Sequence, residues 1–421
     1  MSQLRNVKGT RDLLPEESVL WTAVEACVRD VFGRYGFGEI RTPILEDTAL
    51  FVRGVGESSD IVGKEMYTFD DRKGRSLTLR PESTAAVARA YIQHRLQERP
   101  SPVKLFYIGP QFRYERPQRG RYRQFSQIGA EVLGDAGPAS DAELLVMLLR
   151  FLRALEFDSL VVRLNTVGDA ESRQRFSAAL RSFLEPLRDE LGEDSQRRLE
   201  TNPLRILDTK NPKERELLVD APKLADSLSD DCRAHFDGLL ALLDRFEVPY
   251  EIDDGLVRGL DYYTRTVFEI ASADLGAQDA ILGGGRYDRL VSDLGGPAVP
   301  GIGFAIGQDR LLDVLPDSFR GRHVAAAPVV VVPVGLDNGA EVALEIAEQL
   351  RSRGVATVAE LSGRAMGAAL RQANKLEARG VVLVGEDELA AGTLTYKNFS
   401  TGEQTTVERV ALVDDLSSAD S

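Results

Sequence analysis

The chain has 421 residues, and its composition, 43% hydrophobic and 28% charged, is typical of a folded protein with two or three domains. The formal net charge of −14 argues against a protein that coats nucleic acid without sequence preference, although it leaves room for a local basic groove. No stretch approaches the roughly 20 apolar residues of a membrane span, and the polar start of the chain (1–11) lacks the apolar segment of a signal peptide.

Cysteine and histidine are scarce. Cys27 and Cys232 are distant and unpatterned, which favours two buried thiols in a reducing cytoplasm over a disulfide. The histidines, His94, His235 and His323, are far apart in sequence, which argues against a histidine-rich zinc site and against a Ser-His-Asp triad. We therefore expect a cytoplasmic protein without zinc, whose chemistry does not use histidine as its base.

The first hundred residues combine helical and extended patterns. Apolar spacing predicts a helix over 15–35. An extended segment over 38–46 contains Pro43, which cannot donate to a central ladder, so this strand is expected at a sheet edge or an interface. A second helix is predicted over 81–98, with Pro81 at its first position.

Two strands are predicted over 103–115 and 123–133. Because side chains alternate between the faces of a strand, Arg113 and Glu115 share one face of the first strand. One face of the second strand carries Phe125, Gln127, Gly129 and Glu131. This face suits the floor of a site for a small polar ligand, but alternation alone fits a solvated sheet face with an Arg–Glu pair equally well.

The connection between these strands interleaves guanidinium, aromatic and flexible positions, in the run Gln118-Arg119-Gly120-Arg121-Tyr122-Arg123. Arginine binds phosphate through charge-assisted bidentate hydrogen bonds. The neighbouring Phe125 offers a ring that can stack on a base. For the loop taken alone, a charged hairpin tip without a ligand is the simpler alternative.

The middle of the chain is predicted to be mainly helical at first and then to return to strands. A helix is predicted over 140–156, and a charged, mainly helical inserted module over 169–247. Strands return over 256–270 and 280–287, the second of which contains the glycine run 283–285.

Two features of this region have both a structural and a functional interpretation. A buried Arg258 would need a partner, which Asp261 or Glu269 could supply, or it could point at a developing anionic centre beside tyrosine hydroxyls. The glycines at 283–285 and 301–307 either form bulges and turns or let the backbone approach a ligand closely.

The last part of the chain predicts a separate domain. A strand leads into a helix over 300–315, and a boundary is expected near 317–327. Beyond it, a β-α-β-α-β order followed by two strands predicts a compact α/β domain over 326–421. This domain has no glycine-rich phosphate fingerprint, so it need not bind a nucleotide. The tail over 414–421 is expected to fray.

Together these segments resemble the histidyl-tRNA synthetase family of class II aminoacyl-tRNA synthetases along nearly the whole chain. Three segments resemble the class motifs: 38–46 resembles motif 1, which builds the dimer interface in the family, 112–131 resembles motif 2, and 301–310 resembles motif 3. More specific are the resemblances to the two histidine signature peptides, carried by Leu256 to Glu269 and Gly283 to Arg289. The opening Gly9 to Pro15 and the peptide Asn202 to Asp208 resemble the start and the helical insertion of the same family.

The resemblance implies a fold and an activity. The fold is an α+β catalytic core with an antiparallel sheet over 1–325, a helical insertion at about 169–247 and an α/β anticodon-binding domain over 326–421. The activity is ATP-dependent conversion of L-histidine to histidyl-adenylate and its transfer to tRNA(His), with release of pyrophosphate and AMP. The implied enzyme is a cytoplasmic homodimer that takes ATP with Mg²⁺ and does not bind a membrane.

The resemblance also implies residue roles. The catalytic guanidinium groups would be Arg113 and Arg258. Histidine would be bound by Glu82, Ser83, Thr84, Gln127, Glu131, Tyr262 and Tyr263. ATP would be bound by Arg113, Glu115, Arg121, Phe125 and Arg310. The tRNA acceptor end would meet Gln118 and Arg119. Small departures from the family pattern stand at Ser83, Ser126 and Asp309.

Two rival families share parts of this pattern. The synthetase-like regulatory subunit of ATP phosphoribosyltransferase resembles the catalytic core, but it typically lacks the C-terminal domain and part of the arginine set. Here Arg113, Arg258, Arg310 and the domain after 326 are all present. A class II synthetase for threonine, proline or glycine is the other rival, and the signature at 256–269 argues against it.

Overall fold

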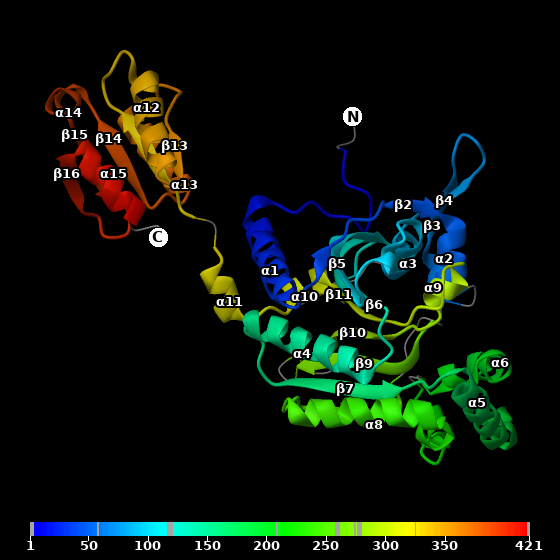
Figure 1. The fold of residues 1–421 in the computed structure, drawn as a ribbon. Coiled ribbons are helices and arrows are strands. Elements are labelled where there is room, and N and C mark those ends of the chain that lie inside the picture. Colours follow the sequence, from blue (N-terminus) through cyan, green and yellow to red (C-terminus); the bar gives the residue numbers. More distant parts are fainter. Residues whose placement is uncertain are drawn as a thin grey trace. The chain divides into compact units, whose positions relative to one another are not determined.

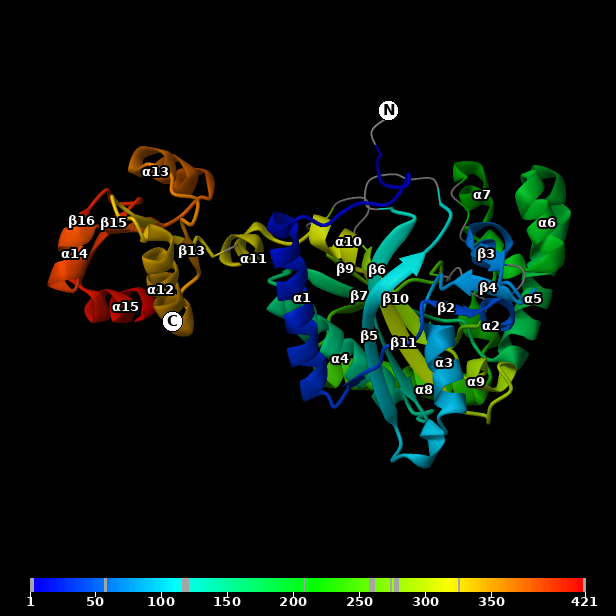
Figure 2. The same ribbon diagram turned by 90° about the horizontal axis from the view of Figure 1, so that it is seen from above.

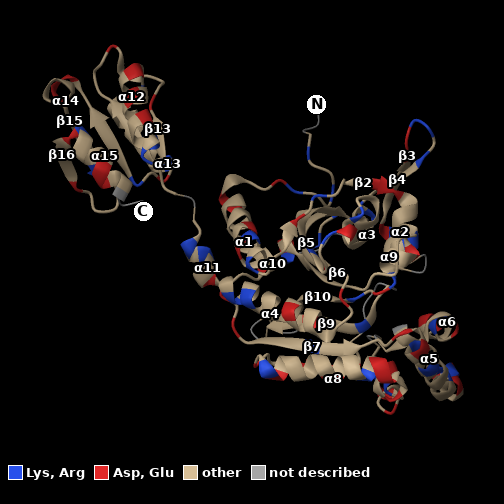
Figure 3. Cartoon of the chain, in the orientation of Figure 1, with Lys and Arg blue, Asp and Glu red and all other residues tan. Residues whose placement is uncertain are grey.

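A computed structural model describes the protein over residues 4–56, 59–115, 121–207, 209, 211–256, 262–272, 275, 280–324 and 326–418. The chain forms two compact units, Met1–His323 and Val324–Ser421, each of which is described by itself. Within the described residues, no helix is long and apolar enough to cross a membrane. Lys and Arg are interspersed with Asp and Glu over both units, so the net negative charge is not confined to one element (Figure 3).

The first unit is built on an eight-stranded sheet, with the order β1-β5-β6-β11-β10-β9-β7-β8 (Figures 1 and 2). Its inner pairs are antiparallel, and only the edge strands β1 and β8 pair in parallel with their neighbours. The strands are β1 (Gly38–Glu39), β5 (Val103–Phe112), β6 (Gln124–Leu133), β7 (Leu160–Thr166), β8 (Tyr250–Ile252), β9 (Thr264–Ser272), β10 (Ala280–Arg286) and β11 (Gly301–Gly307). The antiparallel core sheet predicted from the sequence is therefore confirmed.

One face of this sheet is covered by three helices that share its main hydrophobic core. They are α1 (Pro15–Arg34), α4 (Pro138–Ala154) and α8 (Asp230–Arg245). Phe32 of α1 is fully buried at the centre of this core, where its ring meets those of Phe106, Phe151 and Phe304 edge-on at centroid distances of 5.4–5.8 Å. The packing fixes α1 and α4 against β5, β6 and β11, the strands that carry the candidate site on their other face.

The other face of the sheet carries smaller elements. These are α2 (Thr48–Val55), the single π-helical turn η1 (Ile61–Glu65), α3 (Thr84–Gln93), α9 (Leu290–Asp293) and a three-stranded sheet of β2 (Leu45–Asp47), β4 (Ser76–Leu79) and β3 (Tyr67–Asp70). The extended segment predicted over 38–46 is split between β1, at the edge of the main sheet, and the start of β2, and Pro43 lies in neither strand.

The helix predicted over 81–98 is shorter than expected, because α3 begins at Thr84. The carboxylate of Glu82 accepts hydrogen bonds from the backbone N–H groups of Thr84 (2.6 Å) and Ala85 (3.0 Å). It therefore satisfies the free donors at the helix start from outside the helix. The prediction that Pro81 begins the helix is wrong. The helix begins at Thr84, and the Glu82 side chain binds the N–H groups of its first two residues.

A helical segment is inserted between β7 and β8. It contains α5 (Ala170–Leu184), α6 (Glu193–Thr201) and α7 (Pro212–Leu217), joined by short 3₁₀ turns at Glu185–Glu190, Pro203–Ile206 and Leu224–Ser227. Its buried side chains form their own cluster, which continues into the strand region around Tyr263 and Val267. Leu239 and Leu243 of α8, by contrast, pack in the main core of the sheet.

After β11, α10 (Gln308–Asp313) and α11 (Asp317–Arg322) complete the first unit. The second unit has a five-stranded sheet with the order β13-β12-β14-β15-β16, parallel in its first three strands. Its strands are β12 (Val329–Pro333), β13 (Thr357–Ala359), β14 (Gly380–Val384), β15 (Thr393–Asn398) and β16 (Gln404–Glu408), and its helices are α12 (Gly339–Ser352), α13 (Met366–Lys375), α14 (Glu386–Ala391) and α15 (Arg409–Ser418). This confirms the predicted α/β domain.

Two helices of the second unit were not predicted, and one of them overturns an expectation. The tail was expected to fray from residue 414, but α15 continues to Ser418. Leu412, Val413 and Leu416 are buried in the same cluster as the first strand of this unit. The apolar contacts of these side chains hold a helix whose own sequence contains acidic and small residues that favour fraying.

Candidate active site

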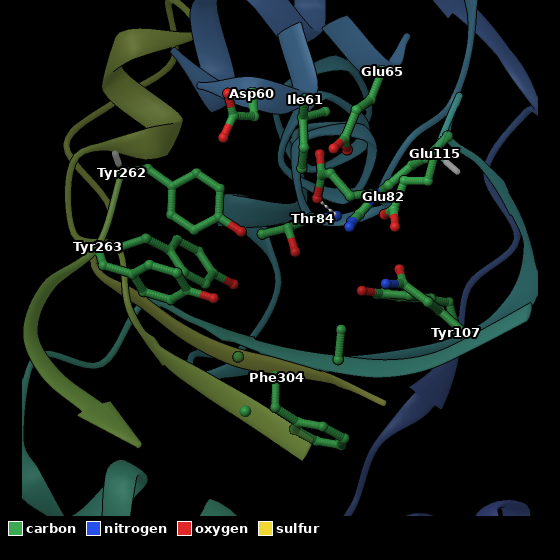
Figure 4. A pocket seen from close by; sticks show the side chains of 16 residues that line it. Asp60, Ile61, Glu65, Glu82, Thr84, Tyr107, Glu115, Tyr262, Tyr263 and Phe304 are labelled. Atoms are coloured by element: carbon green, nitrogen blue, oxygen red, sulfur yellow. Dashed lines mark hydrogen bonds between the residues drawn. The ribbon is translucent and has the colours of Figure 1, made fainter. Parts of the chain in front are cut away.

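The candidate site begins with a cavity of about 350 Å³ on the face of the large sheet that carries α3 (Figure 4). This volume is in the range of pockets for small molecules. The structure brings together in its wall most of the residues that were predicted to bind histidine, although they come from segments up to 181 residues apart, from 82 to 263. They are Glu82, Thr84, Gln127, Tyr262 and Tyr263.

Glu131 is not among the described residues that line this cavity, but it hydrogen-bonds to side chains that do line it. Its carboxylate accepts hydrogen bonds from Thr84 Oγ1 (2.8 Å), from Tyr107 OH (3.5 Å) and from Tyr287 OH. The side chain is 1% exposed, and burial raises the pKa of Glu131 to about 8 although the hydroxyl donors lower it. Once ionised, a carboxylate can accept about four hydrogen bonds, so with these three hydroxyl donors in place the ionised Glu131 retains one acceptor position for a ligand.

Other acceptors line the same cavity. The carboxamide oxygen Oε1 of Gln127 is buried and has no hydrogen-bond partner in the described part of the chain. Such an orphaned acceptor costs about 1–3 kcal/mol, which a donor on a bound ligand would recover. Burial raises the pKa of Glu82, and burial together with the nearby Glu115 raises the pKa of Glu65. An ammonium group is the ligand that best satisfies this combination of acidic and amide oxygens.

Aromatic side chains complete the wall (Figure 4). The Tyr262 ring lies 4.7 Å from that of Tyr263 and 5.7 Å from that of Tyr287, measured between centroids. Burial raises the pKa values of Tyr107, Tyr262 and Tyr287 well above the ordinary value, so these phenols are neutral and can donate hydrogen bonds.

A buried arginine fixes two of these tyrosines. Arg286, which is fully buried, precedes Tyr287 and donates to Asp141 (2.8 Å) and to Asp288 (2.9 Å). The backbone N–H of Asp288 in turn donates to Thr264 Oγ1, next to Tyr263. The ion pair with Asp141 therefore ties the end of β10 to α4, and the Asp288 N–H bond ties it to the start of β9. Replacing Arg286 would leave Asp141 buried without its charge partner.

A second cavity of about 440 Å³ adjoins the first. Three guanidinium groups line it, those of Arg113, Arg121 and Arg310, together with the ring of Phe125. Arg113 lines both cavities, donates through Nε to the carbonyl of Pro81 (2.9 Å) and lies over Phe125, with 5.4 Å between Cζ and the ring centroid. The carboxylates of Glu65, Glu115 and Glu269 also line this second cavity, so it carries both signs of charge. Arg113 lies at the junction of the two cavities.

The remaining predicted residues fall into two groups. The Ser83 hydroxyl accepts a hydrogen bond from Gln111 Nε2 (2.7 Å), and Ser83 does not line either cavity. Arg258, Gln118 and Arg119, for which catalytic and acceptor-end roles were predicted, lie outside the described residues.

Sequence reasoning missed Tyr107 and Tyr287, which bond Glu131. A signal for Tyr107 was present, because alternation along the strand predicted over 103–115 places it on the same face as Arg113. Its cross-strand partner is Gly129, and a Cβ there would lie 2.3 Å from the Tyr107 hydroxyl. This glycine therefore makes room for the tyrosine.

Gly303 provides a test of the geometry, because it lines the first cavity and is packed against Glu131. A Cβ at this position would lie 1.7 Å from Glu131 Oε2 and 2.7 Å from the carbonyl of Ala130. We predict that Gly303→Ala displaces the carboxylate and lowers affinity for the ligand of the first cavity at least tenfold, since overpacking costs about 1–3 kcal/mol. Isothermal titration with L-histidine measures this.

The matched control is Gly33→Ala in α1, where a Cβ would meet nothing within 4 Å. It should leave ligand affinity unchanged and raise stability slightly, by about 0.5–1 kcal/mol. Equal affinities for the wild type and Gly303→Ala would show that Glu131 does not border the ligand.

Comparison with known proteins agrees with this geometry. The sequence model of the family described as histidyl-tRNA synthetase matches residues 9–311, and that of an anticodon binding domain matches 328–418. Similar curated proteins include histidine–tRNA ligases of Nitratidesulfovibrio vulgaris (48% identical over 423 residues, 100% of both chains) and Koribacter versatilis (48% over 420 residues, 97% of this chain and 95% of the relative). The crystal structure of apo S. aureus histidyl-tRNA synthetase superposes with a TM-score of 0.81 at 36% identity, covering 99% of this chain and 100% of that one. The chain therefore belongs to the histidyl-tRNA synthetase family.

Proposed function

We propose that this protein activates L-histidine with Mg²⁺-bound ATP and transfers the histidyl group to tRNA(His). The observation that carries the proposal is the position of Arg113 between two cavities. The first is lined by carboxyl, amide and hydroxyl groups, and the second by three guanidinium groups and Phe125 together with three glutamates. An amino acid in the first cavity and ATP in the second would bring a carboxylate and an α-phosphate together at Arg113. The relatives that are 48% identical over 95% or more of both chains carry the name histidine–tRNA ligase.

In the first step, a carboxylate oxygen of histidine attacks the α-phosphorus of ATP and pyrophosphate leaves. Negative charge grows on the α-phosphate oxygens, and the fixed guanidinium of Arg113 stabilises it with little reorganisation. By the family resemblance, Arg258 acts with Arg113. Arg121 and Arg310 bind the outer phosphates, Phe125 stacks on adenine and Glu115 lies near its amino group.

Recognition of histidine is divided between the two ends of the first cavity. Glu82, Thr84 and Gln127 bind the α-ammonium group, which gives the orphaned Gln127 oxygen a donor. Glu131 and Tyr263 bond the two imidazole nitrogens. A site whose buried groups need both bonds discriminates strongly against side chains that lack them, by up to about 10⁴-fold for a comparable hydroxyl.

In the second step, the terminal ribose hydroxyl of the tRNA attacks the carbonyl of the adenylate and AMP leaves. The adenylate phosphate accepts the hydroxyl proton, so no protein histidine is needed as a base.

The proposal extends to the partners of the chain. The loop with Gln118 and Arg119 meets the acceptor end, while the unit matched by the anticodon-binding model, over 328–418, meets the anticodon. A homodimer forms through the motif 1 segment at 38–46, and the enzyme acts in the cytoplasm.

Deleting residues 326–421 tests the division of labour between the two units. We expect histidine-dependent ATP–pyrophosphate exchange to persist, because both cavities are built from residues of the first unit. Charging of tRNA(His) transcript should fall at least tenfold in kcat/KM, which corresponds to about 1.4 kcal/mol of lost binding. A truncated protein that exchanges and charges like the full chain would refute the assignment of the second unit.

A further inference from the structure

The opening segment of the chain, residues 4–14, has no role in the chemistry described so far. It nevertheless contacts Arg123, which lies between the β5–β6 loop and the first residue of β6. The carbonyl of Gly9 accepts a hydrogen bond from the backbone N–H of Arg123 (2.7 Å). Gly9 has φ +88°, and a Cβ there would lie 2.7 Å from Cγ of Arg123. The backbone of this segment is therefore fitted closely against the start of β6.

Arg11 makes the most extensive contacts of this segment. Its guanidinium donates to Asp309 Oδ1 (3.1 Å) and to Glu17 Oε2 (3.0 Å). Its Cζ lies 4.9 Å from the ring centroid of Tyr122 and 5.9 Å from that of Trp21. One side chain thus joins the N-terminal segment to α1, to the end of the β5–β6 loop and to α10.

Two of these partners belong to the second cavity or adjoin it. Tyr122 lines that cavity, and Asp309 directly precedes Arg310, which also lines it. The other oxygen of Asp309 accepts from the backbone N–H of Ser126 (2.9 Å), next to Phe125. Arg11 does not line the second cavity itself, so any effect on its ligand must act through these neighbours.

An ordinary surface ion pair would be the simplest explanation of Arg11, and such pairs contribute about 0–1 kcal/mol. Three features distinguish Arg11. Its side chain is only 29% exposed, and that of Asp309 is 7% exposed. Its Nε is buried, and two aromatic rings flank the guanidinium. Guanidinium–aromatic contacts hold a planar group in a fixed orientation, which positions the ring as well as the cation.

We propose that Arg11 is a positioning residue for ATP, which holds Tyr122 and α10 in the arrangement that the nucleotide requires. The inference rests on the proposed function, since it takes the second cavity to be the ATP site. Without Arg11, Tyr122 and the first turn of α10 gain freedom that ATP must remove on binding, so ATP affinity falls. Arg11 is not among the described residues that line the first cavity, so the affinity for histidine should not change.

The test uses the full chain and the variants Arg11→Ala and Arg11→Lys. For Arg11→Ala we expect a KM for ATP about tenfold higher in pyrophosphate exchange, equal to about 1.4 kcal/mol, with the KM for histidine unchanged. Arg11→Lys keeps the charge and one donor but loses the planar fork, and should recover part of the loss. The matched control is Arg34→Ala, which removes an exposed arginine paired with Asp30 on α1 and should change neither KM.

Two further measurements separate positioning from simple destabilisation. The melting temperature of each variant reports the structural contribution, and calorimetric titration with ATP reports binding independently of catalysis. If Arg11→Ala lowers the melting temperature but leaves ATP affinity unchanged, or weakens ATP and histidine equally, the inference is wrong. If the wild type binds ATP but shows no histidine-dependent exchange, the proposed function fails, while the titrations still decide the role of Arg11.

Discussion

Arg113→Ala is expected to lower the rate of histidine-dependent ATP–pyrophosphate exchange by about 10²–10³-fold, or about 2.7–4 kcal/mol, as for the removal of one preorganised donor to a developing anion. The positively charged side chain of Arg113 lines both cavities. The hydrogen bond that its Nε donates to the carbonyl of Pro81 fixes its orientation. Because the charge on the α-phosphate grows only as the carboxylate attacks, the loss should appear mainly in kcat. Affinities for ATP and histidine should change comparatively little.

Pre-steady-state adenylate formation and separate titrations with each substrate resolve the two effects. Arg34→Ala serves again as the control, since it removes a guanidinium of the same unit that is 72% exposed and remote from the cavities. If Arg113→Ala weakened ground-state binding of ATP as much as it lowered the rate, Arg113 would be a binding residue only.

Glu131→Gln is expected to lower kcat/KM for histidine by about 10²-fold, equal to about 2.7 kcal/mol, with the KM for ATP unchanged. The substitution keeps the shape of the side chain but fixes one of its two terminal positions as an N–H donor that cannot lose its proton. The amide group of the glutamine would face the hydroxyls of Thr84, Tyr107 and Tyr287, which donate hydrogen bonds to Glu131 in the wild type. Exchange kinetics at varied histidine concentration measure the loss, and an unchanged kcat/KM would remove Glu131 from the recognition of the imidazole.

The same variant tests the environment of Glu131 without any substrate. Burial raises its pKa in the folded protein to about 8, whereas the ordinary value of a glutamate is 4.5. A carboxyl with a raised folded pKa stabilises the fold fully below about pH 4.5, and this contribution is lost as the pH rises through about 8. The melting temperature of the ligand-free wild type should therefore fall relative to that of Glu131→Gln between pH 5 and pH 8. A constant difference would mean that Glu131 is ionised throughout.

Strand alternation predicted which side chains of the central strands share a face, whereas the roles of the site residues came from the family resemblance. The prediction that Gln127 shares a face with Phe125 holds in β6, and Tyr107 shows that the same rule could have been applied further along β5. Alternation succeeds here because the central strands are regular and their pairing over 103–112 and 124–133 has no bulge.

What the sequence could not predict depends on contacts between distant segments. Arg286 and Asp141 are 145 residues apart, and Arg11 and Asp309 are 298 residues apart. The neighbouring residues in the sequence do not distinguish these side chains from solvent-exposed charges. Their partners approach them only when α4, β10 and α10 pack in the folded chain. The start of α3 was misplaced for a related reason, because Glu82 caps the helix from outside and Pro81 alone suggested an earlier start.

The central claim is that the first cavity selects histidine and that the second presents ATP to it. ATP–pyrophosphate exchange measured with each of the twenty amino acids in turn, using folded full-length protein and Mg²⁺, tests this claim most directly. We predict exchange with L-histidine alone, lowered about 10²–10³-fold by Arg113→Ala. Exchange driven equally well by another amino acid, or no exchange with histidine above background, would contradict the account.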